Sequence, residues 1–580
     1  MAAVAPQAKR STLALVLAAS ASAAFGLAFH QRWFPLGVPG ELEVPRLGTW
    51  DVPIASWVAM LPAVALAGAM VAFVVWCLRW IENAPRRSFL LSLVACIAFG
   101  GAFQLFLEIA APGGLQKWAV LHHGFRAAAR LKFDDVSSVF KNHARVAEEL
   151  EPNHVSANPA GWVTVYRALL SFFDAHPDLA RAVWNVEPDE IAWAMRQNFA
   201  TPLPDQAAIA VVAFASRLLG VLVGLPVAWL VRQRFGRQAA LAACAMASLV
   251  PASSLLAPAV DTVYPTIAAL IVALSWYASQ RRSAWPAAAA GALVGVGMFF
   301  SLCFLVVAGL CALMVAFRAL TGHRPTSASV AAAGSAWLAV VGLFAVMVGH
   351  RLWESWSVNL AKNREFNANC GCSYGLWIGV NLLELAVAMG IPATVFLLAR
   401  VVPLPLPSGE GRGEGASASE RVPGVDRLPL KNDGIVPPDP NHPHPNPLPE
   451  GEGKKNDRPR PKRDATLMVA WLSIVVLLDL SGTNRGEVSR LWLFLMPLGA
   501  ALAVEWLDMA DRRGRAVVGA LLLVEALNCV LLARELMLLW PSAPRQIQQQ
   551  YLASPGGKWA SYRRLSDQEI ERRRKSEAAR

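Results

Sequence analysis

Charged side chains are scarce in this chain of 580 residues: only 16% are Asp, Glu, Lys or Arg, while 55% are hydrophobic. A typical soluble domain carries about 25% charged residues. A soluble chain of this length would form about four domains, each with a polar surface. The sequence has too little charge for those surfaces. It therefore excludes an ordinary cytosolic enzyme, a disordered regulator and a coiled coil, and indicates a polytopic membrane protein.

Several chemical motifs are also missing. The sequence contains no Walker motif, no Gly-x-Gly-x-x-Gly loop and no Ser-His-Asp set, so ATP-driven transport has no support. Its 8 cysteines do not make a disulfide framework, because most lie in apolar runs where Cys is a small hydrophobe. The net charge of +12 is explained by membrane topology, without a nucleic-acid partner.

Long apolar runs are abundant. A helix needs about 20 apolar residues to span a bilayer. Thirteen segments are candidates: 11–29, 54–78, 88–110, 207–231, 238–256, 264–279, 285–301, 303–319, 328–349, 375–399, 466–481, 489–507 and 516–540. The sequence therefore predicts an all-α polytopic membrane protein of about 13 transmembrane helices, with a folded outer loop that bears short helices.

The short loops give the orientation. With the N-terminus in the cytoplasm, the inside segments hold 16 Lys and Arg residues and the short outside loops hold 7, as the positive-inside rule requires. The tail at 541–580 is then outside, although it has 9 basic and 4 acidic residues. The first span is long for a signal peptide and is interpreted as an uncleaved anchor.

Composition divides the chain into four regions. Residues 1–400 form the predicted catalytic membrane region, which includes the outer loop at 111–206. Residues 401–464 contain 14 Pro and 8 Gly and are predicted to be a disordered cytoplasmic insertion. Residues 465–540 carry the C-terminal membrane helices, and 541–580 form the basic tail.

Two adjacent carboxylates, Asp134 and Asp135, open the motif LKFDDVSSVF in the outer loop. Asp135 before VSSVF is typical of a helix N-cap, so a capping role competes with a catalytic one. In the catalytic interpretation, one carboxylate takes a proton from an attacking hydroxyl as general base. The other carboxylate can raise the pKa of the first or help to bind a divalent cation. A divalent cation is the one cofactor left open, and no metal-ligand set is assigned.

Other polar residues follow in the same loop. Lys141 and Arg145 are cations that can pair with a phosphate or lie on a solvated helix face. His154 precedes Asn158-Pro159-Ala160-Gly161, a turn that starts a helix. The turn is either a plain helix start or a device that brings His154 back towards the Asp pair.

Charges also gather at the predicted outer ends of later spans. Asp261 is the only charge in its outer loop, in APAVDTVYP. Arg485, Glu487 and Arg490 lie in SGTNRGEVSRLWLFLMP, where Arg490 directly precedes an apolar helix. Such charges are membrane anchors or functional groups, and Arg490 is placed to bind a lipid-linked phosphate.

The order of these features resembles the GT-C superfamily of integral membrane glycosyltransferases. It is closest to the polyprenyl- or dolichyl-phosphate-sugar-dependent group of protein mannosyltransferases, aminoarabinose transferases and mycobacterial arabinofuranosyltransferases. In that group the first large outer loop begins with an acidic residue or pair, here Asp134 and Asp135. A His and a Pro-Pro-Gly-like turn then lead into a helix, here His154 and 158–161, with Ala160 in place of the second Pro. Arg490 is similar to the Arg that precedes a late span in many bacterial members.

The resemblance implies an inverting transfer of a sugar from a polyprenyl-phosphate donor to a hydroxyl of a glycan, lipid or protein. The site would face the periplasm from the inner membrane. Asp134 or Asp135 would deprotonate the acceptor, and Arg485, Arg490 or Lys141 would stabilise the leaving phosphate. The other candidates are expected to bind substrate: Arg145, His154, Asn158, Asp261 and Glu487.

Two other function classes compete with this one. A lipid or glycolipid transporter or flippase would carry out no chemistry and would favour broken spans and charges in mid-membrane. A structural subunit of an envelope assembly is the third class. Charges at outer ends and a folded outer loop favour the enzyme.

Overall fold

The computed structural model describes residues 4–31, 33, 37–38, 42–43, 55–111, 114–150, 155–188, 191, 195, 201–323, 325–349, 352–369, 372–401, 464–483, 485 and 488–536. This part of the chain is built almost entirely from helices. Its one sheet is an antiparallel pair of two-residue strands, β1 (Gly37–Val38) and β2 (Leu42–Glu43). The predicted helical class is therefore confirmed.

Eight helical segments in the described residues are long and apolar enough to cross a membrane. They are α1 (Val4–His30), α2 (Trp57–Cys77), α3 (Arg86–Ala110), α9 (Leu203–Val221) with α10 (Gly224–Phe235), η3 (Val260–Val263) with α13 (Tyr264–Arg281), α15 (Cys303–Leu320), α16 (Ser327–Val348) and α23 (Arg512–Glu535). A bent pair, α17 (Leu352–Asn369) and α18 (Tyr374–Met389), would make a ninth.

The predicted number of 13 spans is not confirmed. The remaining apolar segments form shorter helices: α11 (Arg237–Ser248), α12 (Pro251–Leu255), α14 (Ala284–Met298), α19 (Ile391–Val401), α20 (Thr466–Ser481), η4 (Leu493–Leu495) and α22 (Met496–Val504). Helices α14 and α20 are uninterrupted but have only 15 and 16 residues, whereas backbone breaks divide the predicted spans 375–399 and 238–256. Gly390, at a φ of 107°, separates α18 from α19, and Leu249 and Val250 separate α11 from α12, which begins at Pro251. A hydropathy average over about 20 residues does not register such breaks.

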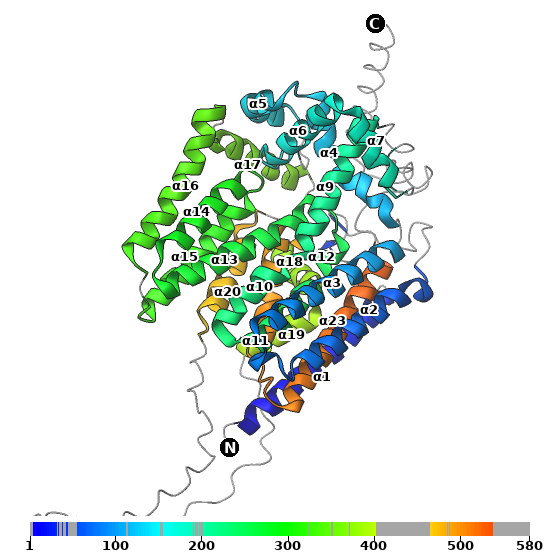
Figure 1. Ribbon diagram of the computed structural model, residues 1–580, viewed down its shortest axis with the longest axis vertical. Helices are drawn as coiled ribbons and strands as arrows, with labels where there is room; N and C mark the ends of the chain where they lie inside the picture. The colour runs from blue at the N-terminus through cyan, green and yellow to red at the C-terminus, as the bar shows by residue number, and fades with distance from the viewer. Residues whose placement is uncertain are drawn as a thin grey trace, which may run out of the picture. The chain divides into compact units, whose positions relative to one another are not determined.

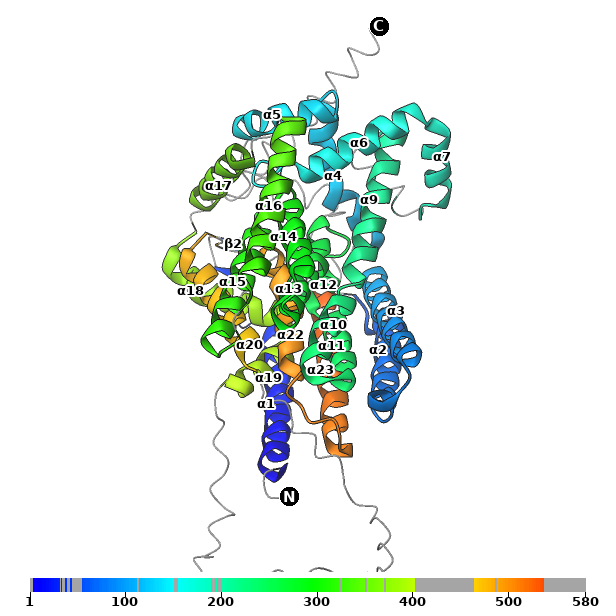
Figure 2. The ribbon, with the colours of Figure 1, turned by 60° about the vertical axis from the view of Figure 1, so that its left-hand side comes forward.

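Four helices of the predicted outer loop lie at the end of the helices opposite the start of α1 (Figures 1 and 2). They are α4 (Lys117–Leu131), α5 (Val136–Glu149), α6 (Gly161–Ala175) and α7 (Pro177–Val186). The short elements η1 (Ile81–Asn83), η2 (Gly114–Gln116) and α21 (Val488–Leu491) complete the described helices. The loop is thus folded, as its composition predicts.

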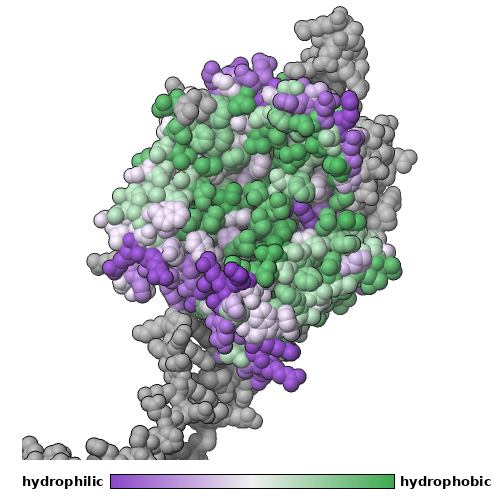
Figure 3. All heavy atoms as spheres, viewed as in Figure 1, coloured by the Kyte–Doolittle hydropathy of each residue, from purple (hydrophilic) through white to green (hydrophobic). Residues whose placement is uncertain are grey.

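Apolar surface supports the membrane interpretation. On the face shown in Figure 3, hydrophobic residues gather across the middle of the helices and hydrophilic residues mostly at the two ends. Leu91 on α3 is 69% exposed and Val58 on α2 is 74% exposed. Large exposed apolar patches are rare on soluble monomers, whereas lipid solvates them. This exposed apolar surface is consistent with a multi-pass membrane protein.

The last turn of α19 and the segment just before α20 both contribute to one ion-pair cluster. Glu505 is buried and accepts hydrogen bonds from Arg234 Nη1 at 2.8 Å and Arg400 Nη1 at 2.5 Å. Arg234 Nη2 donates to the Asp464 carbonyl at 2.9 Å, and Arg318 pairs with the Asp464 carboxylate at 3.2 Å. The chain divides here into a unit of 1–403 with 464–580 and a unit of 404–463. The second unit and residues 537–580 lie outside the described residues.

Candidate functional site

Two charges that the sequence singles out separately meet in the structure. Arg490 of α21 lies with Nε 3.6 Å from Oδ2 of Asp261 in η3. The two side chains are 17% and 22% exposed, respectively. The pair therefore joins two distant outer-end segments and remains partly open to solvent or a ligand.

The start of α6 packs beside this pair. Trp162 Nε1 donates to the Tyr264 hydroxyl at 2.7 Å, and Tyr264 is the first residue of α13, next to η3. The Gly161 amide donates to the Phe299 carbonyl at 2.9 Å. A Cβ at Gly161 would lie 2.7 Å from that carbonyl oxygen and 2.6 Å from the Phe300 ring. The glycine that ends the 158–161 turn is therefore required by close approach.

Helix α17 holds the other side of the same turn. Asn359 is fully buried, and its Nδ2 donates to the carbonyls of Ser156 at 2.7 Å and Asn158 at 3.1 Å. Ser355, one turn earlier, lies 3.3 Å from His143 Nδ1 of α5. The structure thus uses the backbone of Asn158 to place the turn, where the sequence predicted a substrate-binding residue.

An acid that the sequence did not single out holds the segment that carries Arg490. The Val488 amide, at the start of α21, donates to Glu384 Oε2 at 3.1 Å. Glu384 is the only acid in the apolar run at 375–399, and an isolated acid in such a run is the signal that could have identified it. Trp162, Tyr264 and Asn359 carry no comparable signal, because their partners are distant in sequence.

Arg485 makes backbone contacts of its own. Its Nη1 donates to the Cys372 carbonyl at 2.8 Å and its Nε to the Gly482 carbonyl at 3.1 Å. Its guanidinium also lies 5.4 Å from the centre of the Tyr374 ring. These contacts join the segment after α20 to the start of α18. They favour a structural role for Arg485 over the predicted phosphate contact.

Asp135 is the N-cap of α5. Its Oδ1 accepts the Ser138 amide at 2.6 Å, and Ser138 Oγ accepts the Asp135 amide at 3.1 Å, which completes a capping box. Asp134 and Asp135 are both exposed. Neither forms an ion pair or hydrogen bond with Asp261 or Arg490 in the described structure. The capping alternative is confirmed for Asp135.

The remaining predicted residues lie apart from the pair or outside the described residues. Lys141 and Arg145 are exposed on α5, and Arg145 pairs with Glu149 at 3.6 Å on the same helix. His154 and Glu487 are not among the described residues. The described residues also contain no cluster of three or more His, Cys, Asp or Glu that could hold a metal ion.

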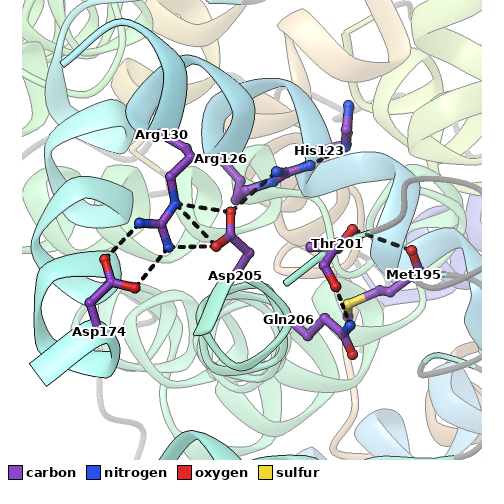
Figure 4. A network of polar contacts seen from close by, with 8 residues as sticks. All are labelled: His123, Arg126, Arg130, Asp174, Met195, Thr201, Asp205 and Gln206. Atoms are coloured by element: carbon purple, nitrogen blue, oxygen red, sulfur yellow. Dashed lines mark hydrogen bonds and ion pairs between the residues drawn. The ribbon is translucent and has the colours of Figure 1, made fainter. Parts of the chain in front are cut away.

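A buried ion network fixes the outer helices to the span α9 (Figure 4). Asp205 is fully buried in the first turn of α9 and accepts from Arg126 at 3.2 Å and Arg130 at 2.5 Å. Arg130 also donates to Asp174 of α6 at 2.6 Å, and Arg126 lies 2.7 Å from His123 Nδ1. One carboxylate therefore joins α4 to α9, and Arg130 extends the connection to α6.

A second polar junction lies between α3, α4 and α9. Glu108 is buried, and its carboxylate accepts from Arg217 Nη1 at 2.7 Å and Trp118 Nε1 at 2.6 Å. His122 is also buried, and its Nε2 lies 3.1 Å from the Pro258 carbonyl. Burial lowers the pKa of His122 to about 4, partly offset by that hydrogen bond. His122 is therefore neutral near pH 7 and donates to Pro258, just before η3.

Comparisons with protein-family models, with curated proteins and with solved structures give no match for this chain. The function is therefore argued from the geometry of the site.

Proposed function

We propose that this protein is a membrane glycosyltransferase that moves a sugar from a polyprenyl-phosphate donor to an acceptor hydroxyl, with inversion at the anomeric carbon. The observation that carries the proposal is the Asp261–Arg490 pair, half-buried beside the start of α6. Such a transfer needs a base for the acceptor and a cation for the leaving phosphate. A carboxylate and a guanidinium at one point supply both kinds of group.

In this mechanism Asp261 takes the proton of the acceptor hydroxyl while its oxygen attacks the anomeric carbon. The bond from that carbon to the phosphate oxygen breaks, and polyprenyl phosphate leaves with the electron pair. Arg490 releases Asp261 and binds the leaving phosphate on the opposite face of the anomeric carbon, because guanidinium groups match phosphate oxygens in geometry and charge. Asp134 is the second candidate for the base, since the carboxylate of Asp135 caps α5.

We also propose that the protein lies in the inner membrane, with this site on the periplasmic face. The excess of Lys and Arg in the predicted inside segments supports that orientation. A donor activated by its own phosphate needs no nucleotide on the periplasmic side. The sugar and the acceptor are not specified by the residues of the site.

The test uses membranes that contain the full chain and radiolabelled polyprenyl-phosphate sugars. Transfer of label to an acceptor supports the enzyme. Label that crosses the membrane unchanged supports the flippase. If label is neither transferred nor moved across the membrane, the structural subunit is supported. Glu525, a buried acid within α23, and the break between α18 and α19 at Gly390 favour a transporter, so both readouts are needed.

Matched variants identify the base. Asp261→Asn and Arg490→Gln should each reduce transfer at least a hundredfold at normal protein level and membrane insertion. Asn caps helices as well as Asp does, so Asp135→Asn keeps the cap of α5 and removes only a base. Full activity in Asp135→Asn with loss in Asp261→Asn supports the assignment. Full transfer by Asp261→Asn would overturn it.

A further inference from the structure

A fully buried carboxylate lies near the middle of the last apolar helix. Glu525 belongs to α23, which packs against α1, α2, α12 and α19. An acid at this depth of a membrane helix is costly and is a functional-site hypothesis by default. The residue takes no part in the Asp261–Arg490 site.

Two features beside Glu525 would stabilise a negative charge on its carboxylate. Its Oε2 accepts the amide of Ala393, in the first turn of α19, at 3.3 Å. Helix N-termini stabilise negative charge. The carboxylate lies directly against Gly390, where a Cβ would be 1.5 Å from Oε1. The break between α18 and α19 therefore makes room for the carboxylate and aims a helix N-terminus at it.

Other buried polar side chains of α23 and of the neighbouring helix α12 also lack hydrogen-bond partners among the described residues. Glu525 Oε1 has no hydrogen-bond partner among the described residues, and neither has Oδ1 or Nδ2 of Asn528. Asn528 is 4% exposed and lies one turn further along α23, on the same side as Glu525. The hydroxyls of Ser253 and Ser254, in α12 against α23, are also unpartnered in the described structure. Buried polar atoms nearly always have partners, so these side chains are candidates to bind a ligand together with Glu525.

Charge indicates the chemistry of that ligand. No Lys, Arg or His of the described residues forms an ion pair with Glu525. A buried water would satisfy hydrogen bonds but would leave an ionised Glu525 without a compensating charge. The available ligands are carboxylate, amide and hydroxyl oxygens, which suit hard cations. With one carboxylate, a monovalent ion leaves the cluster neutral, whereas a divalent ion leaves it charged.

We propose that Glu525, Asn528 and the α12 hydroxyls form a binding site for one sodium ion within the membrane. The ion joins α23 to the α18–α19 break and to α12. The site is independent of the proposed sugar transfer, so its test reads the stability of the protein and not its activity.

The experiment measures thermal unfolding of the full-length protein, purified in detergent, in NaCl, KCl and choline chloride at equal ionic strength. We expect the unfolding temperature to rise with NaCl in a saturable way and by several degrees more than in choline chloride. Glu525→Gln should abolish that difference, and Asn528→Ala should weaken the apparent sodium affinity about tenfold. Glu535→Gln is the matched control, because Glu535 lies on the same helix but pairs with His30 and Arg534.

Equal unfolding temperatures in the three salts would overturn the proposal. An unchanged sodium response in Glu525→Gln would do the same. A response to pH without a response to sodium would show a protonated carboxyl in place of a bound ion. If Glu525→Gln does not fold, equilibrium binding of ²²Na⁺ to the wild-type protein and to Asn528→Ala decides the question, and absence of binding to the wild type refutes the site.

Discussion

The strongest test of the fold is the removal of the Asp205 carboxylate. Asp205 is fully buried and neutralises Arg126, which is 4% exposed, as well as Arg130. Asp205→Ala would leave Arg126 as an uncompensated buried charge. Breaking a buried pair in this way costs about 3 to 5 kcal/mol of unfolding free energy. The same Arg130 also binds Asp174, whose side chain is 40% exposed. Asp174→Ala should therefore cost at most about 1 kcal/mol.

The assay is equilibrium unfolding in mixed micelles, followed by tryptophan fluorescence while the fraction of denaturing detergent rises. Asp205→Ala should unfold at a much lower fraction than Asp174→Ala. The double variant Asp205→Ala with Arg126→Met should recover part of the loss, because it removes the stranded charge. Equal losses in the two single variants, or no recovery in the double variant, would refute the role given to burial.

Three further predictions follow from particular contacts. The pKa of His122 is about 4 in the folded protein, against an ordinary value of 6.5, so the unfolded chain binds a proton first as the pH falls. The free energy of unfolding should therefore drop by about 3 kcal/mol between pH 6.5 and 4. His122→Gln should remove that drop when thermal unfolding is measured as a function of pH. Gly161→Ala should lower the free energy of unfolding by about 1 to 3 kcal/mol, because the new Cβ clashes with the Phe299 carbonyl. A Cβ at Gly124 would lie 3.8 Å from its nearest neighbour, so Gly124→Ala should be neutral or stabilising in the same unfolding assay. Replacing 404–463 with a Gly/Ser linker of about 10 residues should leave the unfolding temperature unchanged. Arg400 before this segment is held by Glu505, and Asp464 after it is held by Arg234, which itself pairs with Glu505. Loss of folded protein on size-exclusion chromatography would contradict this prediction.

Much of the fold class follows from local patterns. The scarcity of charge and the long apolar runs predict membrane helices, and eight of the predicted spans coincide with helices of sufficient length. The sequence VSSVF after Asp135 predicts a capped helix, and α5 begins there. The turn at 158–161 predicts the start of a helix, and α6 begins at Gly161. These features depend on neighbours within a few turns, so they can be read along the chain.

The candidate site depends on contacts that the chain order hides. Asp261 and Arg490 are recognisable one at a time as charges at apolar ends, but their 3.6 Å approach requires η3 and η4 to pack together. Prominence in a motif also misleads: Asp135 is conspicuous and caps a helix, while Glu384 is inconspicuous and holds the segment of Arg490.

The sequence by itself determined that the chain is a helical membrane protein, which loop is folded, and which charges lie near the ends of apolar segments. Those properties arise from composition and short-range periodicity. Only the tertiary structure decided which charges meet, which glycines allow close approach, and that Glu525 faces a helix break without a cationic partner among the described residues. Pairing between distant segments is set by how whole helices pack, and no local pattern encodes it.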